Sequence, residues 1–588
     1  MILKALYDYY DRLKDKMPAM HLAYVNYMYA ILIDDDGNFC GLERLGDEDG
    51  LPVKSFRPEE RTSAPVAHCM GDNGSYVLGL KDIKIGMPFD YGKEIKKNSK
   101  NHETFKADVE DIFASLPHNR YAKAVHLFYQ RYNEAILHDM SVDVNWPDFC
   151  KLLNKNITFR IVGENMLAAS DPEIIMHKIS YITNQNNEAI CMITGLKSKP
   201  VSTTYSTFIV GGKSNAKLVA FQVNSGYDSY GKKMGLNAPI SEEAEFKYTT
   251  ALLDMLSKKS SHKFMVGNRT YLFWASNNSD TALKAEEEFY NMIGAGHQDV
   301  NPNENIEQVR KVFEAIYKNT LKTTSKDIFY ILGLAPNAAR IAVTYWTEIP
   351  LREFAGTILK HFEDMEVADT RLYKKPYMSL RNILSAVTLG GKTSDATPNL
   401  PDAIVKSIFQ GLPYPQTLFA SCIRRIRAES SKEKFEEARR KGYIITRAAI
   451  IKAYLNRLND NEQRIKVMLD KDNTNQGYLC GRLFAVLDKI QEEANNQHSI
   501  RERYMNSASS TPAAVFSTIL NLSNHHLEKL ENEGRRIYFE KLKQEIISKI
   551  DADGFLSQLD LQDQGRFFIG YYHQRQDFFT KNEENNNE

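Results

Sequence analysis

The hydrophobic pattern of this chain changes near residue 350. Before that point short strand-like segments alternate with helical ones, whereas beyond it apolar residues recur every three or four positions and strand patterns vanish. The sequence therefore predicts an α+β N-terminal part followed by an all-α C-terminal helical bundle. We divide the chain into an α+β domain at 1–350, a basic helical segment at 351–467 and a helical bundle at 468–588.

Local patterns predict the elements of the first part. The apolar spacing at 2–13 is typical of an amphipathic helix, and Gly267 with Asn268 forms the predicted turn of a hairpin at 264–274. Ser241 is expected to cap the helix that follows it. The remaining strands are predicted at 29–33, 76–80, 156–163, 191–195 and 217–223, and the helices at 103–113, 121–138 and 241–257.

Apolar stripes in the last part predict a helical core. They occupy 479–490, 516–530 and 542–550, with spacings of three and four residues. Thr511 followed by Pro512 is typical of a helix start, because proline is tolerated in the first turn. We interpret the stripes as bundle core rather than as a binding surface.

Composition limits the location and the chemistry of the protein. The 588 residues include 75 Lys and Arg against 75 Asp and Glu, which excludes a globally basic nucleic-acid coat. No apolar run reaches the roughly 18–20 residues of a membrane span, and the N-terminus lacks a signal-peptide pattern. The six cysteines are widely scattered, as is typical of reduced, mostly buried thiols. We therefore expect a cytoplasmic protein.

The charge is unevenly distributed along the chain. Residues 371–452 carry sixteen Lys and Arg against six Asp and Glu, whereas 32–49 and 276–309 are acidic. Cationic side chains that meet a phosphate backbone gain free energy by releasing condensed counterions. The basic stretch is therefore a candidate nucleic-acid surface, and the alternative is an ordinary solvated helix face.

Several fragments resemble catalytic motifs but have the wrong spacing. GGKS at 211–214 and GGKT at 390–393 end like P-loops, yet Thr207 and Ala386 stand where the first glycine is needed. A lone His-Asp pair at 138–139 has no further ligands at metal-binding spacing, and no HExxH or GxSxG motif occurs. We expect no enzymatic activity, no metal and no cofactor.

Seven segments, in order along the chain, together resemble one family. They are MILKALYDYYDRL (1–13), DNGSYVLGL (72–80), SYGKKMGLNAPISEEAEFKYTTAL (229–252), LGLAPNAARIAV (332–343), GLPYPQTLFASCIRRIRAE (411–429), GRLFAVLDKIQEEA (481–494) and GYYHQRQDFF (570–579). The chain resembles the large subunit of subtype I-C CRISPR Cascade, the Csd-type member of the CRISPR-associated eight family.

The resemblance implies a non-catalytic subunit of an RNA-guided surveillance complex. Such a subunit recognises the protospacer-adjacent motif (PAM), promotes duplex opening and R-loop formation, and recruits the nuclease-helicase. Because R-loop formation is nearly balanced in free energy, protein contacts that begin strand separation matter strongly. The implied partners are the guide RNA ribonucleoprotein, double-stranded target DNA, the Cascade backbone subunits, the 5′-handle subunit and the small subunit.

The first candidate for motif reading is the loop at 61–76. Asn73 is compact and polar, and minor-groove readers use Asn, Gln, Lys and Arg. The alternative is that Asn73 serves only a turn, because Asn and Gly tolerate a positive φ. Further candidates for phosphate or groove contacts are Arg61, Lys81, Lys197, Lys199, Lys213 and Lys217, for which ordinary surface charge is the alternative.

A second set of candidates comes from the basic segment and the bundle. The residues interpreted as a basic nucleic-acid surface are Lys374, Lys375, Arg381, Arg424, Arg425, Arg427, Arg447, Arg482, Arg501 and Arg503. The C-terminal part resembles the Cascade small subunit, which the resemblance implies is also made as a separate protein from an internal start. Met468 is the predicted start, and an ordinary core methionine is the alternative.

Two other functions are weighed against this one. A stand-alone metal-dependent nuclease would need clustered acidic ligands, and the acidic segments show no recognisable ligand spacing. The third possibility is a scaffold that tethers other subunits without touching DNA, and charge reversal at 424–427 that left DNA binding intact would favour it.

Overall fold

The computed structural model divides the chain into two compact units. Unit 1 comprises Met1–Phe208 and Ser214–Asp254, and unit 2 comprises Ile209–Lys213 and Met255–Glu588. The predicted change at 350 therefore falls inside unit 2. The structure describes residues 2–61, 64–81, 83, 90–182, 188–222, 228, 230–293, 302–371, 378–458, 464–495 and 499–579.

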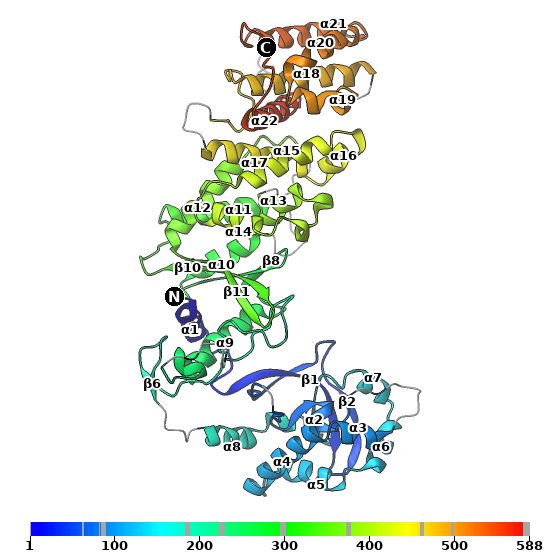
Figure 1. The fold of residues 1–588 in the computed structure, drawn as a ribbon, viewed down its shortest axis with the longest axis vertical. Coiled ribbons are helices and arrows are strands. Elements are labelled where there is room, and N and C mark those ends of the chain that lie inside the picture. The colour runs from blue at the N-terminus through cyan, green and yellow to red at the C-terminus, as the bar shows by residue number, and fades with distance from the viewer. Residues whose placement is uncertain are drawn as a thin grey trace. The chain divides into compact units, whose positions relative to one another are not determined.

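A five-stranded sheet organises unit 1 (Figure 1). Its longest strand pairs antiparallel with β2 and β3 and parallel with β5, which in turn pairs with β4. Phe128 and Phe159 meet edge to face at 5.3 Å between ring centroids, where helix α5 packs on the sheet. The strands are β1 Leu22–Ile33, β2 Phe39–Arg44, β3 Leu51–Phe56, β4 Gly71–Asn73 and β5 Asn156–Ile161.

Helices and a small hairpin complete unit 1. The two short strands of the hairpin are β6 Ala189–Ile190 and β7 Lys197–Ser198. The helices that begin in this unit are α1 Ile2–Arg12, α2 Gly74–Val77, α3 Tyr91–Lys97, α4 Ser99–Ser115, α5 Arg120–Arg131, α6 Glu134–Ser141, α7 Trp146–Lys151, η1 Ala168–Ser170, α8 Pro172–Ile182, η2 Met234–Asn237 and α9 Glu242–Leu256.

Unit 2 begins with an antiparallel sheet in the order β11-β10-β9-β8. The strands are β8 Lys263–Val266, β9 Arg269–Ala275, β10 Ile328–Asn337 and β11 Arg340–Pro350. Beyond Pro350 the described residues contain helices and no further strand, which confirms the predicted all-α C-terminal part. The helices of unit 2 are α10 Asp280–Met292, α11 Pro302–Tyr317, α12 Leu351–Met365, α13 Leu380–Val387, η3 Leu389–Gly391, η4 Thr393–Asp395, α14 Leu400–Phe409, α15 Gln416–Ala428, α16 Lys432–Arg440, α17 Tyr443–Leu458, α18 Gln476–Asn495, α19 Ser499–Ala508, α20 Pro512–Glu528, α21 Glu533–Ile547 and α22 Leu561–Asp577.

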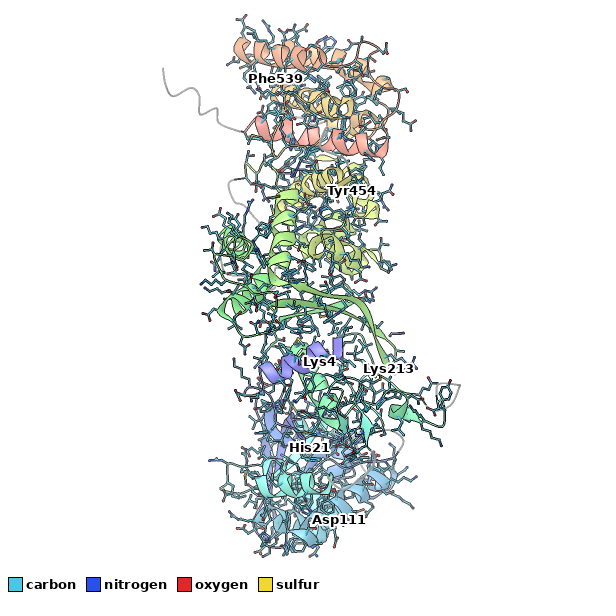
Figure 2. The ribbon with its side chains drawn as sticks, turned by 90° about the vertical axis from the view of Figure 1, so that its left-hand side faces the viewer. Lys4, His21, Asp111, Lys213, Tyr454 and Phe539 are labelled. Carbon is cyan, nitrogen blue, oxygen red and sulfur yellow. The ribbon has the colours of Figure 1, made fainter. Side chains whose placement is uncertain are left out.

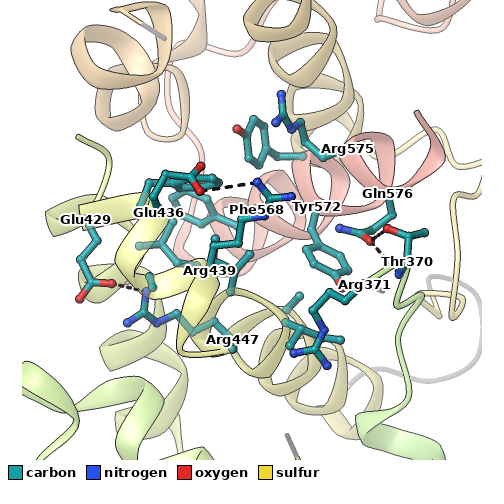
Figure 3. Close-up of a pocket in the computed structure, with 18 of the residues that line it drawn as sticks. Thr370, Arg371, Glu429, Glu436, Arg439, Arg447, Phe568, Tyr572, Arg575 and Gln576 are labelled. Carbon is teal, nitrogen blue, oxygen red and sulfur yellow. Dashed lines mark hydrogen bonds and ion pairs between the residues drawn. The ribbon is translucent and has the colours of Figure 1, made fainter. Parts of the chain in front are cut away.

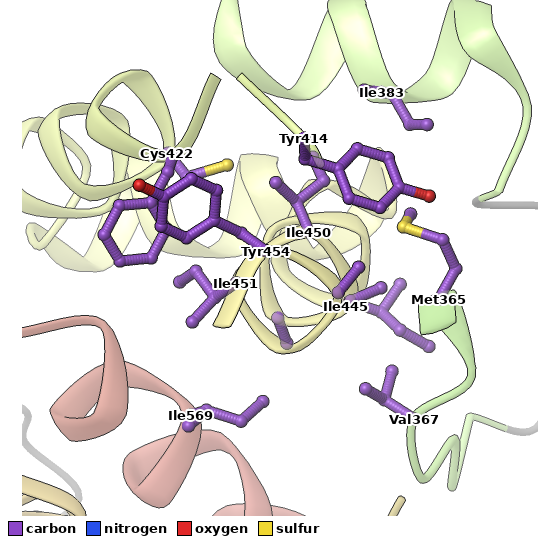
Figure 4. Close-up of a cluster of buried hydrophobic side chains, with 14 of the residues drawn as sticks. Met365, Val367, Ile383, Tyr414, Cys422, Ile445, Ile450, Ile451, Tyr454 and Ile569 are labelled. Carbon is purple, nitrogen blue, oxygen red and sulfur yellow. The ribbon is translucent and has the colours of Figure 1, made fainter. Parts of the chain in front are cut away.

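One hydrophobic core runs through unit 2 from its sheet to its last helix. Helix α22 returns to pack against both α18 and α17. Figure 4 shows Ile451 of α17 and Ile569 of α22 in the same buried cluster as Met365 and Tyr414. Residues before and after 468 therefore share one core.

Most of the predicted elements are confirmed. The helix at 2–13, the strands at 29–33 and 156–163 and the hairpin at 264–274 are present, with β1 longer than predicted. Ser241 caps α9, because its Oγ accepts a hydrogen bond from the Ala244 amide at 3.2 Å. The apolar stripes fall on α18, α20 and α21, with a few residues beyond the helix ends.

Three predicted strands and one predicted helix are wrong. Residues 76–80 form the end of α2 and a turn, because Asn73 caps a helical turn there. Residues 191–195 are the turn between β6 and β7, and the described residues of 217–223 form no named strand. The helix at 121–138 is two helices, since Asn133 accepts hydrogen bonds from two amides and starts α6.

None of the helices among the described residues combines the length and the hydropathy needed to cross a bilayer.

A buried histidine makes the stability of unit 2 depend on pH. His361 is held neutral between the Tyr414 hydroxyl at 2.7 Å and the Met378 carbonyl at 2.8 Å, and burial lowers its pKa to about 4. The unfolded chain takes up this proton below about pH 6.5, so stability falls as the pH drops. We expect this residue to cost about 2 kcal/mol between pH 8 and pH 5.

Urea unfolding at both pH values tests this expectation. The His361→Gln variant removes the titrating ring, so its urea midpoint should fall less between pH 8 and pH 5 than that of the native chain. An equal fall in both proteins would show that His361 is not responsible.

Candidate nucleic-acid interface

A buried carboxylate organises the loop at 61–76. Asp72 is fully buried and accepts hydrogen bonds from the His68 amide at 3.1 Å and the Asn73 amide at 2.8 Å. It also forms an ion pair with Arg61, whose guanidinium lies 3.9 Å from the centroid of the Tyr76 ring. Arg61 therefore holds the loop together, and its role as a phosphate anchor stays a prediction.

Asn73 ends β4 and caps α2. Its backbone is extended, with φ −72° and ψ 164°, so the alternative of a turn at positive φ is wrong in its geometry. The side-chain Oδ1 accepts hydrogen bonds from the Ser75 amide at 3.1 Å and the Ser75 hydroxyl at 2.7 Å. Within the described part of the chain the Nδ2 group has no hydrogen-bond partner. The Oδ1 atom of the half-buried side chain therefore serves the cap, and the Nδ2 group can donate to another acceptor.

Four lysines that the sequence pattern did not single out lie beside the helical turn α2. The Asn101 amide donates to the Ser75 hydroxyl at 3.2 Å, and the Asn98 amide donates to the Gly79 carbonyl at 3.1 Å, so the junction of α3 and α4 is fixed to the turn. The lysines at this junction are exposed. We call Lys93, Lys96, Lys97 and Lys100 the α3–α4 lysines. Their signal was a short run, YGKEIKKNSK, with four lysines against one glutamate.

The loop lysines fall into two groups. Lys199 pairs with Glu242 at 2.9 Å and Lys217 pairs with Glu60 at 3.3 Å, so both are engaged within unit 1. The other three are exposed and have no ion-pair partner among the described residues: Lys81, Lys197 and Lys213. Lys213 belongs to unit 2, where its amide approaches the Ala338 carbonyl beside the β10–β11 hairpin (Figure 2).

Three arginines interpreted as nucleic-acid surface lie in the interior of unit 2. Arg447 is 2% exposed and pairs with Glu429 at 2.6 Å. Arg482 is fully buried and pairs with Glu545 at 3.1 Å, and Arg501 is fully buried against the Phe435 ring. A buried guanidinium needs partners in place of water, and these contacts supply part of them. The surface interpretation is wrong for these three residues.

The remaining candidates of the basic set differ in exposure. Arg425 pairs with Glu429, and Arg427 donates to Ser509 and Gln564, each at 3.1 Å. Both of these arginines are half-buried, and burial lowers the pKa of Arg427. The exposed members are Arg381, Arg424 and Arg503. Lys374 and Lys375 lie outside the described residues.

Met468 is exposed in the segment that joins α17 to α18. The alternative of a core methionine is therefore wrong.

Among the described residues no group of three or more His, Cys, Asp or Glu side chains is placed to hold a metal ion.

Comparison with known proteins gives one finding. A family model described as CRISPR-associated protein (Cas_Csd1) matches residues 6–579, which is nearly the whole chain. No curated protein matches the chain.

Proposed function

Because the chain belongs to the CRISPR-associated protein (Cas_Csd1) family, we propose that it is the non-catalytic large subunit of a subtype I-C Cascade. In this role it recognises the protospacer-adjacent motif, promotes duplex opening and R-loop formation, and recruits the nuclease-helicase. The observation that carries the proposal is the match over almost the entire chain. Its partners would be the guide RNA ribonucleoprotein, the backbone and 5′-handle subunits, the small subunit and duplex DNA.

The geometry around Asn73 fits the reading of a short motif. A free amide donor can meet the N3 and O2 acceptors that base pairs present in the minor groove. The α3–α4 lysines beside it can hold the phosphates, which position a protein on DNA without carrying sequence information. We therefore assign base reading to Asn73 and backbone anchoring to the α3–α4 lysines with Lys81.

The α3–α4 lysines should contribute to the salt dependence of DNA binding. Replacing Lys93, Lys96 and Lys100 with alanine should weaken duplex binding by the assembled complex and flatten its dependence on salt. Each lost phosphate contact lowers the slope of log K against log salt concentration by about 0.9. Fluorescence anisotropy over a salt series measures this slope.

A matched control uses three other exposed lysines of unit 1, replaced in the same way: Lys14, Lys16 and Lys54. The control variant should keep the native slope. If the two triple variants had equal slopes, the α3–α4 lysines would not be phosphate contacts.

The rival functions give different results. A stand-alone nuclease would cleave DNA when the purified protein is mixed with Mg²⁺ or Mn²⁺, whereas we expect intact DNA. A scaffold without DNA contacts would leave duplex binding by the complex unchanged in every variant of the interface.

We also propose Met468 as the internal start of a separate small subunit. The exposed side chain allows Met468→Ala without loss of packing, so the full-length chain should accumulate normally while the short C-terminal product disappears. Immunodetection with a C-terminal tag measures both products. A short product of unchanged size in the variant would contradict Met468 as the start.

A further inference from the structure

A cavity of about 710 Å³ lies within unit 2 between α15–α17 and α22. This volume is in the range of sites that hold small organic ligands. Figure 3 shows side chains from both parts of the chain around it, including Glu429, Arg439 and Arg447 on one side and Tyr572 on α22. The cavity therefore exists only where residues before and after 468 come together.

The lining is rich in positive charge. Five arginines line the cavity against two glutamates, Glu429 and Glu436. Arg439 is exposed. Its ion pair with Glu436 is long, at 3.5 Å, and is screened by solvent. Arg440 is exposed and has no ion-pair partner among the described residues. These two arginines remain available to an anion that enters the cavity.

A buried charge strengthens this preference. Arg447 lines the cavity and shares Glu429 with Arg425, so a single carboxylate serves two guanidinium groups. The Nη2 atom of Arg447 is buried and has no hydrogen-bond partner within the part of the chain that the structure describes. Because charges interact more strongly where water is excluded, the excess positive charge favours an anionic ligand.

The rest of the lining is apolar and aromatic. Phe568, Tyr572, Ile445 and Ile451 form buried parts of the wall, and Phe579 leaves half of its side chain exposed. Aromatic rings beside arginines are the combination that proteins use to stack bases and bind phosphates. A purely aliphatic ligand would leave the arginines without a partner, and inorganic phosphate would leave the apolar wall uncovered.

We propose that this cavity binds a nucleoside phosphate, either free or as one unit of a single-stranded nucleic acid. The base packs on the aromatic wall and the phosphate lies against Arg439 and Arg440, whose fork geometry suits phosphate oxygens. The site is separate from the Asn73 interface and does not depend on motif reading. A product that starts at Met468 lacks α16 and α17 and should not bind at this site.

Binding to the purified full-length protein tests the proposal. The probes are the mononucleotides AMP and UMP, measured by calorimetry, and a fluorescent single-stranded oligonucleotide of about eight nucleotides, measured by anisotropy. The variant Arg439→Glu with Arg440→Glu should bind at least about tenfold more weakly, because charge-assisted phosphate contacts are lost. Ile444→Trp, which fills the cavity and keeps every charge, should weaken binding to a similar extent.

The control pair is Lys432→Glu with Lys434→Glu, two exposed cations on α16 that do not line the cavity. If both cavity variants weaken mononucleotide binding and the control pair does not, the ligand is a free nucleotide. The same pattern with the oligonucleotide alone indicates one unit of a strand. Failure of both probes to bind, or equal weakening in the control pair, overturns the proposal. Thermal unfolding of each variant confirms that it is folded.

Discussion

Gly481→Ala is expected to destabilise unit 2 by more than about 3 kcal/mol, although alanine is the better helix former. Gly481 lies where α18 crosses α22 with their backbones in contact. A Cβ at this position would stand 1.9 Å from the Phe567 carbonyl oxygen and 2.9 Å from the Tyr571 amide nitrogen. Gly570 faces the same crossing from α22, and a Cβ added there would stand 2.3 Å from the Tyr478 carbonyl oxygen. Backbone atoms cannot rotate away, so the helices must separate.

The sign of the effect makes this a sharp test. Helix propensity alone predicts a stabilisation of about 1 kcal/mol for this substitution. The control is Gly534→Ala in the exposed first turn of α21. There the atom nearest to the added Cβ is Oδ1 of Asn532, at 3.2 Å. Urea unfolding should place the midpoint of Gly481→Ala well below that of the native protein and that of Gly534→Ala near it. A raised midpoint for Gly481→Ala would contradict the close crossing.

The second large effect concerns Asn73 and separates its two roles. Asn73→Ala removes both the cap and the amide donor, and loss of the cap costs about 1 kcal/mol. Asn73→Asp keeps an acceptor for the Ser75 amide and replaces the donor with a negatively charged oxygen. We therefore expect Asn73→Asp to be as stable as the native protein and to lose the motif preference as fully as Asn73→Ala, about tenfold or more.

Binding of both variants in the assembled complex measures this preference on duplexes with and without the motif. A single-stranded target complementary to the guide controls for the added negative charge of aspartate, and its affinity should not change. If Asn73→Asp kept the motif preference, Asn73 would be only a helix cap.

Local patterns in the sequence were sufficient for the main elements of the fold. The strand-like segment at 156–163 correctly predicted β5, and a two-residue turn predicted the β8–β9 hairpin, because both patterns depend on neighbouring residues. The strand at 76–80 was wrong because Asn73 caps a helical turn at Gly74–Val77, a contact that the apolar pattern of YVLGL does not show. The change of pattern near 350 is a change of element type, and the sheet before it and α12 after it share one core.

The candidate site could be predicted only in part. Arg482 pairs with Glu545 across 63 residues of sequence, and no local pattern shows that this arginine turns inward. Arg447 meets Glu429 from a different helix in the same way. Charge counts along the chain therefore overestimated the nucleic-acid surface in both the basic segment and the bundle. They also overlooked the α3–α4 lysines, whose run is short but whose side chains are all exposed.

We propose that this chain lets an RNA-guided complex recognise and open duplex DNA. The most direct measurement compares complexes assembled with and without the chain for binding to duplex targets that carry or lack the motif. We expect that only the complete complex binds the duplex with the motif, while both complexes bind a complementary single strand. Equal duplex binding without the chain would contradict its proposed role in motif recognition.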